Sequence, residues 1–375
     1  MKILHVITSL LTGGAEKLMV DLLPRMRALG YDVELCIFCG DRTPFYEQLD
    51  ACGVKTYSFH KGLKGLYSPM NIVRLRKVIK QGNYDVIHTH NTAPQLFAAI
   101  AGLGTNVKLV TTEHNTDNRR RKIPMLKLGD KWMYSRYSKV ICISDQAEIN
   151  LREYLHASDT TKICTIYNGI DYNKYAQAEP ADDIIQLKVD APKAEADGDV
   201  KVITMVAAFR PQKDHKTMIK AMEYLPDNYH LCLVGSGELF EEIRAYANSF
   251  AYKDRIHLTG LRNDIPNVLS ASDFVVMSSH YEGLSLSNLE GMASGKPFIA
   301  SDVDGLREIV KGNGVLVEHE NATALAEAIM KLDADAEYRA QIIKKCQAKA
   351  FQYDISNMAE SYLSVYEKLM NNGKN

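Results

Sequence analysis

Two glutamates stand eight positions apart in a segment whose residue types could bind a ligand. Glu282 lies in a polar loop, and Glu290 lies about one turn into the helix expected over residues 287–293. The apolar run 274–277 before them is typical of a buried strand. In an open α/β sheet, ligands bind at the edge where such strands end. Both carboxylates are therefore candidates for contacts with the hydroxyl groups of a ligand.

The loop between the two glutamates predicts an anion site, because the first backbone N–H groups of a helix have no partner within it. Two carboxylates around an anion site suit a ligand with hydroxyls at both ends and phosphate in the middle, such as a nucleotide-sugar. The spacing alone is weak evidence, since a chain with 46 acidic residues contains several such pairs by chance. The loop residues are Gly283, Leu284, Ser285, Leu286 and Ser287.

The composition is that of an ordinary globular protein, with 46% apolar and 24% charged residues among 375. This length suggests two domains. No stretch approaches the about 18 uninterrupted apolar residues of a membrane span. Residues 1–7 are followed directly by a glycine turn, which favours a first strand over a signal peptide. The seven cysteines are scattered, which points to a reducing compartment, and no clustered metal-ligand signature is present.

Positive charge gathers in the first half of the chain. Residues 1–172 hold 23 Lys and Arg against 16 Asp and Glu, a net of +7, and the remainder holds 22 against 30, a net of −8. The basic residues concentrate between 119 and 139, where apolar residues are interleaved. This is typical of a basic amphipathic helix on an anionic membrane, or of a solvated helix whose apolar side packs inward. No nucleic-acid module is recognisable. The densest basic run is Arg119, Arg120, Arg121 and Lys122.

Short apolar runs alternate with helix-period segments along most of the chain. This alternation predicts parallel sheets with helices on both faces. The pattern breaks at residues 173–200, which are polar and turn-rich and are interpreted as a linker with a surface excursion. We therefore expect an α/β protein of two doubly wound, Rossmann-like domains, 1–172 and 201–354, whose sheets face a central cleft.

Two glycine-rich turns follow expected strands. Gly14, in Thr-Gly-Gly-Ala-Glu after the first strand, would let the backbone approach a ligand and would leave a helix N-terminus open to an anion. Gly235 stands in a similar Gly-Ser-Gly turn. Either turn could also lack a ligand. The dinucleotide fingerprint Gly-x-Gly-x-x-Gly is absent, which disfavours NAD.

Cations and a histidine also stand where strands are expected to end. Arg210 and Lys213 follow the first strand of the second domain and could neutralise a diphosphate leaving group, although a solvated basic loop has the same composition. His114 ends a strand of the first domain and could hydrogen-bond a sugar or an acceptor. A lone histidine is more often structural.

In this order, the segments resemble the retaining GT-B glycosyltransferases of family 4, of the bacterial polysaccharide and glycolipid type. The resemblance covers essentially the whole chain. Each motif alone is weak evidence for this family, but so many motifs in the expected order are specific for it. The matching motifs are Gly13-Gly14, Glu113-His114-Asn115, Tyr167-Asn168-Gly169-Ile170-Asp171, Pro211-Gln212-Lys213-Asp214-His215, Val234-Gly235-Ser236-Gly237, Gly260-Leu261-Arg262-Asn263-Asp264-Ile265, Ser279-His280-Tyr281-Glu282-Gly283, Glu290-Gly291-Met292, Gly295-Lys296-Pro297 and Asp304-Gly305-Leu306-Arg307-Glu308.

The resemblance implies a role for each matching residue. Glu290 would hold the ribose hydroxyls of the nucleotide, and Glu282 would contact hydroxyls of the transferred sugar. The backbone N–H groups of 284–287 would bind the diphosphate together with Lys213. His114 would contact the donor sugar near the reacting carbon.

The same resemblance implies that Leu261 and Arg262 border the nucleotide base and that the last helix, within 355–375, packs on the first domain. One departure is present. Family members usually carry an arginine five or six positions before the lysine, but residues 207–208 are both alanine here. Arg210 could substitute for that arginine, or it could make no contact with the donor.

No pair of residues forms an evident nucleophile and base. The resemblance implies front-face departure of the nucleoside diphosphate, whose own phosphate oxygen accepts the acceptor's proton, with no metal and no cofactor. We expect transfer of a hexose, from a UDP-sugar on family frequency, to a lipid-linked saccharide or membrane lipid, by a cytoplasmic protein peripheral at the inner membrane face. Two alternatives remain, a GT-B sugar epimerase and a catalytically inactive nucleotide-sugar-binding or scaffold subunit.

Overall fold

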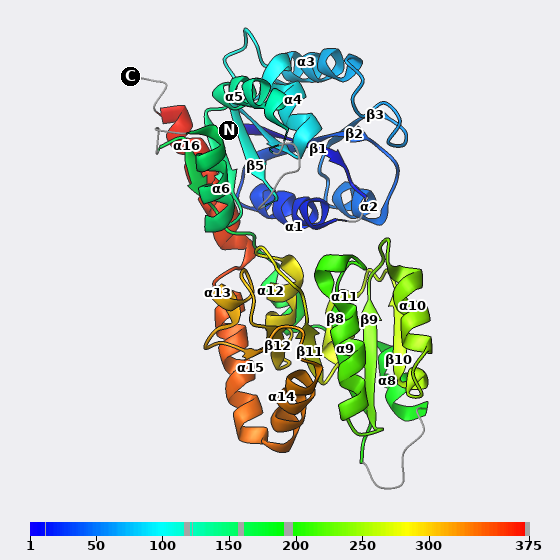
Figure 1. The fold of residues 1–375 in the computed structure, drawn as a ribbon. Coiled ribbons are helices and arrows are strands. Elements are labelled where there is room, and N and C mark those ends of the chain that lie inside the picture. Colours follow the sequence, from blue (N-terminus) through cyan, green and yellow to red (C-terminus); the bar gives the residue numbers. More distant parts are fainter. Residues whose placement is uncertain (12, 116–120, 122, 157–160, 191–197, 372–375) are drawn as a thin grey trace. The chain divides into compact units, whose positions relative to one another are not determined.

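A computed structural model describes residues 1–11, 13–115, 121, 123–156, 161–190 and 198–371. The chain divides into two compact units, of which unit 1 combines Met1–Gly169 with Ile355–Asn375 and unit 2 is Ile170–Asp354 (Figure 1). No helix among the described residues is long and apolar enough to cross a bilayer.

Unit 1 is built on a seven-stranded parallel sheet of order β3-β2-β1-β4-β5-β6-β7. Most residues of its inner strands are buried because helices cover both faces of a parallel sheet, although these strands also hold buried polar side chains such as those of His88, His90 and Thr112. The strands are β1 (Lys2–Ser9), β2 (Asp32–Cys39), β3 (Thr56–His60), β4 (Val86–His90), β5 (Lys108–Glu113), β6 (Lys139–Cys142) and β7 (Ile163–Thr165). The helices are α1 (Gly14–Ala28), α2 (Pro44–Ala51), α3 (Met70–Gly82), α4 (Thr92–Ala101), η2 (Pro124–Leu126), α5 (Lys127–Ser135), α6 (Asp145–Leu155) and α16 (Ile355–Asn371).

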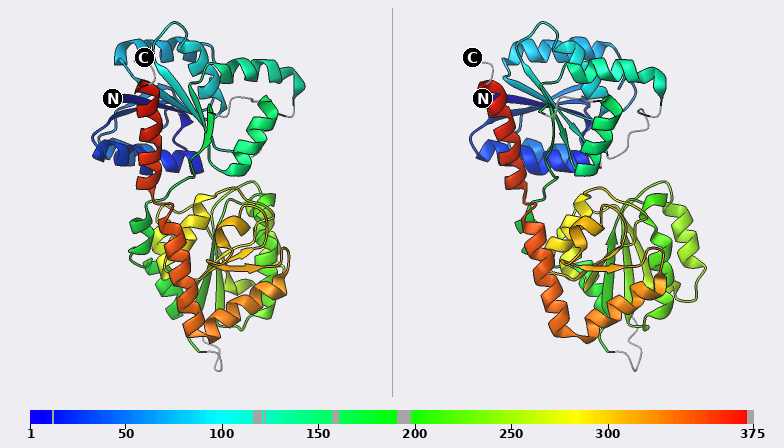
Figure 2. Two further views of the ribbon diagram at one scale, coloured as in Figure 1. Left: turned by 90° about the vertical axis from the view of Figure 1, so that its left-hand side faces the viewer. Right: turned by 60° about the vertical axis from the view of Figure 1, so that its left-hand side comes forward.

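Two hydrophobic layers cover the sheet of unit 1. Helices α3, α4, α5 and α6 pack on one face, and α1, α2 and α16 pack on the other. Figure 2 shows the C-terminal helix α16, in red, lying along unit 1. Tyr362 and Tyr366 of α16 are fully buried, so this helix is part of the core of unit 1.

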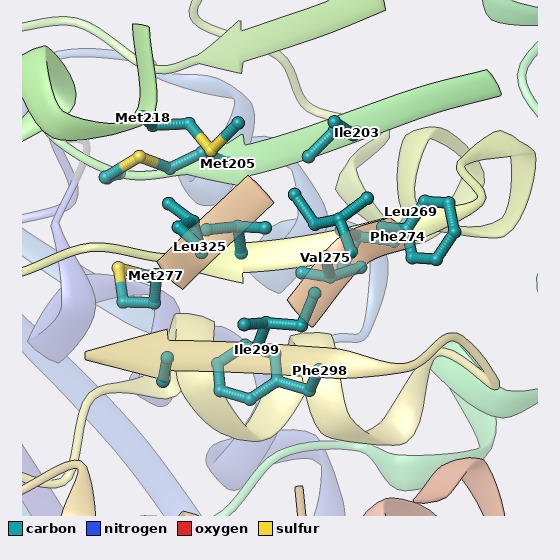
Figure 3. Packing of buried hydrophobic residues seen from close by; sticks show 14 of the residues in the cluster. Ile203, Met205, Met218, Leu269, Phe274, Val275, Met277, Phe298, Ile299 and Leu325 are labelled. Carbon is teal, nitrogen blue, oxygen red and sulfur yellow. The ribbon is translucent and has the colours of Figure 1, made fainter. Parts of the chain in front are cut away.

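Unit 2 is built on a six-stranded parallel sheet of order β10-β9-β8-β11-β12-β13. Figure 3 shows its central strands packed through apolar side chains that include Met205, Val275 and Ile299. The strands are β8 (Lys201–Val206), β9 (Tyr229–Val234), β10 (Ile256–Gly260), β11 (Phe274–Met277), β12 (Phe298–Ser301) and β13 (Val315–Val317). The helices are α7 (Tyr172–Ala176), α8 (Asp182–Asp190), η3 (Pro211–Lys213), α9 (His215–Ala221), η4 (Met222–Tyr224), α10 (Phe240–Asn248), η5 (Lys253–Arg255), α11 (Ile265–Ala271), α12 (Leu286–Ala293), α13 (Arg307–Val310), α14 (Ala322–Ala334) and α15 (Ala336–Phe351).

The interpretation of residues 173–200 as a linker is wrong for the part up to Asp190. Helices α7 and α8 lie there and belong to unit 2. The Ala181 N–H donates to the Asn267 carbonyl at 3.0 Å, and Lys188 pairs with Asp273 at 2.7 Å. These helices are polar because they lie at the surface, where tertiary contacts hold them despite a weak local pattern.

Candidate functional site

The strand order of unit 2 creates one point where the chain direction switches. The connections from β8 run outward to β9 and β10, whereas those from β11 run the opposite way to β12 and β13. Ligands of doubly wound sheets bind at the carboxyl ends of strands at such a switch point. Lys213 follows β8 and Glu282 follows β11, so both flank the switch.

Lys213 and Glu282 form an ion pair at this point. The lysine side chain is 13% exposed and the glutamate side chain 3% exposed, so the pair is largely shielded from water. Ser279 donates a hydrogen bond to the same carboxylate oxygen, Oε1, at 2.6 Å. None of the contacts between described residues uses Glu282 Oε2, which leaves that oxygen available to a hydroxyl group of a ligand.

A tight backbone framework holds the Glu282 loop. The His280 N–H donates to the Gln212 carbonyl at 2.8 Å, and the Gln212 amide donates to the Tyr281 carbonyl at 2.8 Å. Gly305 has φ +85°, and a Cβ there would lie 1.9 Å from the Glu282 carbonyl oxygen. The loops after β8, β11 and β12 are therefore packed against one another.

Glu290 lies within α12, as expected, and is buried. The Tyr175 hydroxyl donates to its Oε1 at 2.9 Å. Tyr175 belongs to α7, in the segment interpreted as a linker, so sequence reasoning missed this partner. No local signal in the sequence would have paired it with Glu290.

The anion site expected in the loop at the start of α12 stays a prediction. The side chains of Leu284 and Leu286 are buried in the core of unit 2, so these residues can meet a ligand only through their backbone. Ser285 is the N-cap residue, with no cap hydrogen bond from its side chain, and its N–H donates to the Gly283 carbonyl at 2.9 Å. Ser287 lies in the first turn, where N–H groups lack helical partners.

Close packing against the backbone of a neighbouring loop explains why glycines occupy the turn after β9. Gly235 has φ +145°, and a Cβ there would lie 2.1 Å from the Ala207 carbonyl oxygen. Gly237, with φ +159°, would likewise meet the Phe209 carbonyl oxygen at 2.4 Å. This close approach packs the turn after β9 onto the loop after β8. That loop carries Arg210, whose side chain is exposed.

Arg262 is held by acids of its own unit. Its guanidinium pairs with Asp264 at 2.6 Å and also with Asp183 of α8. This arrangement anchors α8 and does not favour the predicted contact between Arg262 and a base, because two carboxylates already balance its charge. The neighbouring Leu261 is 58% exposed after β10 and remains free to border a base.

The glycine turn after β1 leads into the N-terminus of a helix, as the sequence predicted, and Gly14 is the first residue of α1, with Gly13 at the N-cap position. A Cβ at Gly13 would lie 2.3 Å from Glu16 Oε2, so this carboxylate folds back over the start of the helix. Burial raises the pKa of Glu16, and hydrogen bonds from its own backbone and from Asn91 oppose that effect. The turn thus already holds an internal carboxylate, which competes with the anion that we expected there.

His114 lies at the end of β5 and forms one end of a chain of histidines. Its Nε2 is 2.8 Å from His90 Nδ1, and His90 Nε2 is 3.0 Å from His5 Nδ1. His88 bridges Tyr366 and Thr112, which ties β4 to α16 and β5. The pattern His-x-His at the end of β4, which puts both rings on one face, was a signal that sequence reasoning missed.

Burial keeps these histidines neutral at ordinary pH. It lowers the pKa of His114 to about 4, against an opposing effect of Glu113, and that of His5 to about 3. Burial and the neighbouring histidines hold the pKa values of His88 and His90 well below the usual range. Because a neutral imidazole has one donor and one acceptor, each ring in the chain sets the tautomer of the next.

The expectation that Arg121 meets a membrane is wrong. Its guanidinium pairs with Glu113 at 2.8 Å, and the two side chains are only 7% and 3% exposed. The buried carboxylate of Glu113 draws the arginine inward because a buried charge needs a partner. The other three residues of the basic run, Arg119, Arg120 and Lys122, lie outside the described residues.

The segment that follows exposes an apolar surface. In α5, Asp130, Met133 and Tyr134 face inward. We call the exposed side chains around them the α5 patch. Exposed apolar patches mark contact sites with proteins or membranes, and five large apolar side chains are exposed within residues 123–132. The α5 patch comprises Ile123 (48% exposed), Met125 (91%), Leu126 (41%), Leu128 (81%) and Trp132 (43%).

The fold also assembles possible metal-ligand groups that no sequence spacing indicated. Among the described residues, two groups of three such side chains have their ligand atoms within 4.8 Å of one another. Each group combines residues from different segments, which explains why the sequence did not reveal them. The groups are His5, His88 and His90 in unit 1, and Asp214, His280 and His319 in unit 2.

Comparison with known proteins agrees with this fold. Residues 12–174 match the family model described as Glycosyltransferase Family 4, and residues 188–349 match that described as Glycosyl transferases group 1. Two Rossmann-like units with these matches define a GT-B glycosyltransferase. The chain belongs to family 4 of that class.

Individual relatives extend over most of the chain. The UDP-Gal:alpha-D-GlcNAc-diphosphoundecaprenol alpha-1,3-galactosyltransferase of Escherichia coli is 29% identical over 354 residues, which cover 89% of this chain and 88% of that protein. An N-acetylgalactosaminyltransferase of Campylobacter jejuni, named for a diphospho-undecaprenol substrate, is 25% identical and covers 95% of this chain and 97% of its own. In structure, Anabaena HepE in complex with UDP and glucose matches with a TM-score of 0.82 at 23% identity, over 98% of this chain and 99% of that one, which shows the shared fold.

Proposed function

We propose that this glycosyltransferase moves a hexose from a UDP-sugar to a lipid-linked saccharide, with retention of configuration and without a catalytic metal. The observation that carries the proposal is the Lys213–Glu282–Ser279 group at the switch point of unit 2, beside the start of α12. A cation and a helix N-terminus suit a diphosphate, and the adjacent carboxylate suits the hydroxyls of a sugar.

In this proposal, unit 2 stabilises the departing nucleoside diphosphate. Lys213 has three N–H donors, so it can keep its bond to Glu282 and donate to a phosphate oxygen. The first N–H groups of α12 donate to the other phosphate oxygens. Negative charge develops on the diphosphate as the glycosidic bond breaks. These donors, which the fold has already positioned, would stabilise that charge.

The carboxylates have binding roles in the same proposal. The Glu282 carboxylate is held by Lys213 and Ser279. In this environment it would accept a hydrogen bond from a sugar hydroxyl and would not attack carbon as a nucleophile. Glu290, fixed by Tyr175, would accept the ribose hydroxyls. With no protein base assigned, a phosphate oxygen of the leaving group would take the acceptor's proton, while neutral His114 would hydrogen-bond the transferred sugar.

The acceptor proposal has two supports. The Escherichia coli and Campylobacter jejuni relatives are named for undecaprenol-diphosphate saccharides. The α5 patch, with Lys127 and Lys131 on the same helix, combines exposed apolar side chains with cations, as a peripheral membrane contact requires. A chain with this surface would meet an acceptor whose lipid tail is embedded in a bilayer.

Activity is tested by incubating the purified protein with UDP-, GDP- or ADP-hexoses and an undecaprenyl-diphosphate saccharide, with and without added Mg²⁺ or Mn²⁺. We expect transfer from a UDP-hexose that added Mg²⁺ or Mn²⁺ does not increase, and an α-linked product from an α-linked donor by NMR. A β-linked product would refute retention. If the donor is isomerised in a reaction without acceptor, the protein is an epimerase. If it binds the donor without turnover, it is an inactive subunit.

Membrane contact is tested by sedimentation with vesicles that contain anionic lipid. Leu128→Ser should reduce the bound fraction several-fold, whereas Val73→Ser, at a residue of α3 that is 61% exposed and outside the α5 patch, should leave it unchanged. Equal loss in both variants, or none in either, would exclude the α5 patch as the contact.

A further inference from the structure

Four side chains from three loops of unit 2 meet beside the Glu282 loop. His280 lies two residues before Glu282, and His319 and Glu320 follow β13. Asp214 immediately precedes α9. These residues are separated by up to about a hundred positions in the chain, and the sheet order brings their loops to one edge. The two imidazoles and the Asp214 carboxylate are a ligand set for a divalent transition-metal ion, and Glu320 contacts both imidazoles.

The two histidines and Glu320 contact one another directly. His280 Nδ1 lies 2.7 Å from His319 Nε2 and 3.2 Å from Glu320 Oε1, and the last two atoms are 3.8 Å apart. Tetrahedral ligands at about 2.0–2.1 Å from Zn²⁺ lie roughly 3.3–3.4 Å from one another, so the two rings would separate by roughly 0.6 Å as an ion replaced their hydrogen bond.

Asp214 joins the two histidines in a group of three ligand atoms. One of its carboxylate oxygens is within 4.8 Å of one ring nitrogen of each histidine. Its Oδ1 accepts the Thr217 N–H and caps α9, while its Oδ2 is buried without a hydrogen-bond partner among the described residues. A buried carboxylate oxygen without a partner is costly, and an adjacent cation would remove that cost.

The surroundings of this group suit entry of an ion. Asp214 and His280 both line a cavity of about 280 Å³. The side chains of His280 and His319 are each 34% exposed, and that of Glu320 is 61% exposed, so the ligands can be reached from solvent. Glu320 adopts φ +58°, a left-handed conformation that is uncommon outside glycine, and its carboxylate contacts both histidines.

We propose that Asp214, His280 and His319, with Glu320 beside the two histidines, bind one Zn²⁺-type ion that fastens the donor loops of unit 2. The nitrogen ligands select such an ion over Mg²⁺, which prefers oxygen ligands and retains water. The ion would join the loops after β8, β11 and β13, two of which carry Lys213 and Glu282. It has a structural role, and the proposal does not depend on which sugar, or whether any sugar, is transferred.

The histidine group of unit 1 does not compete for this role. Both nitrogens of His88 already have partners, Tyr366 and Thr112, and His5 and His90 bond to each other. All three rings are fully buried. An ion there would have to displace both partners of His88 and cross the core of the unit, whereas in unit 2 it would replace the partly buried hydrogen bond between His280 and His319.

The test is calorimetric titration of the metal-free, full-length protein with ZnCl₂, repeated with MgCl₂. We expect one Zn²⁺ site per chain and no Mg²⁺ binding that competes with it. His319→Ala and Glu320→Gln should weaken Zn²⁺ binding at least about tenfold. His257→Ala is the matched control, since His257 is also paired with a histidine, His230, at 3.0 Å but belongs to no group of three ligands among the described residues.

Thermal unfolding gives an independent readout. Zn²⁺ should raise the unfolding midpoint of the wild type and of His257→Ala, but not that of Asp214→Asn, whose side chain still caps α9 while its charge is removed. Binding of equal strength and stoichiometry in wild type and His319→Ala would overturn the proposal, as would absence of Zn²⁺ binding by the wild type. Neither readout uses donor or acceptor, so failure of the proposed transfer reaction would leave this result unaffected.

Discussion

Replacement of Lys213 by methionine separates the electrostatic role of this residue from its role in folding. Methionine keeps much of the side-chain volume and removes the charge. The variant loses the predicted charge-assisted contact with the diphosphate, of roughly 1.5–3 kcal/mol. That loss corresponds to a fall of about 10- to 150-fold in kcat/KM, since about 1.4 kcal/mol changes a rate tenfold.

The same substitution also affects stability, because Glu282 loses its cation. The glutamate side chain is 3% exposed, and removal of one partner of a buried pair costs about 3–5 kcal/mol. The double variant Lys213→Met with Glu282→Gln removes both charges, and the Ser279 hydroxyl can still donate to the amide oxygen. We therefore expect the double variant to regain most of the lost stability.

The assay combines initial rates of sugar transfer with urea unfolding of wild type, both single variants and the double variant. The electrostatic role predicts that stability returns in the double variant while kcat/KM stays low. Transfer by Lys213→Met within about threefold of wild type would refute the diphosphate contact. Recovery of wild-type transfer in the double variant would show that Lys213 acts only by neutralising Glu282.

Three further outcomes are expected. Glu290→Ala should weaken UDP binding in calorimetry by at least about tenfold, given hydrogen bonds to a charged group; unchanged affinity, or an equal loss in Tyr175→Phe, would contradict a ribose contact. His90→Phe should lower kcat while UDP affinity is unchanged, because His90 orients His114; an unaffected kcat would remove that role. Between pH 6.5 and pH 4, His5 and His114 bind protons in the unfolded chain but stay neutral in the folded chain, where their pKa values are lowered to about 3 and about 4. The free energy of unfolding should therefore fall as the pH falls towards 4. A His5→Phe variant with the same pH slope as wild type would argue against this linkage.

The sequence predicted the features that depend on local pattern. Alternation of apolar runs and helix-period segments indicated parallel α/β units, and the position of Glu290 after the strand 274–277 indicated its place in α12. Lys213 and Glu282 were each placed at a strand end for the same reason. Their ion pair was not predicted, because it depends on β8 lying next to β11, which no spacing along the chain reveals.

The errors arose where tertiary contacts outweigh local composition. The segment of α7 and α8 is polar, yet Arg262 anchors α8 through Asp183. Arg121 belongs to a basic run that would suit a membrane surface, yet Glu113 pairs with it in the interior. In each case a charged residue was assigned to solvent or to a ligand when its partner lay elsewhere in the fold.

The ion pair at the switch point also bears on how a donor would be recognised. Lys213 and Glu282 balance each other's charge before any ligand arrives, and Ser279 fixes the shared oxygen. A donor that brings both a diphosphate and sugar hydroxyls can use the remaining donors of the lysine and the second oxygen of the glutamate. It would extend this network without breaking it, which limits the reorganisation needed on binding. A nucleoside diphosphate without its sugar would engage the lysine alone, so the pair favours the intact donor over the product.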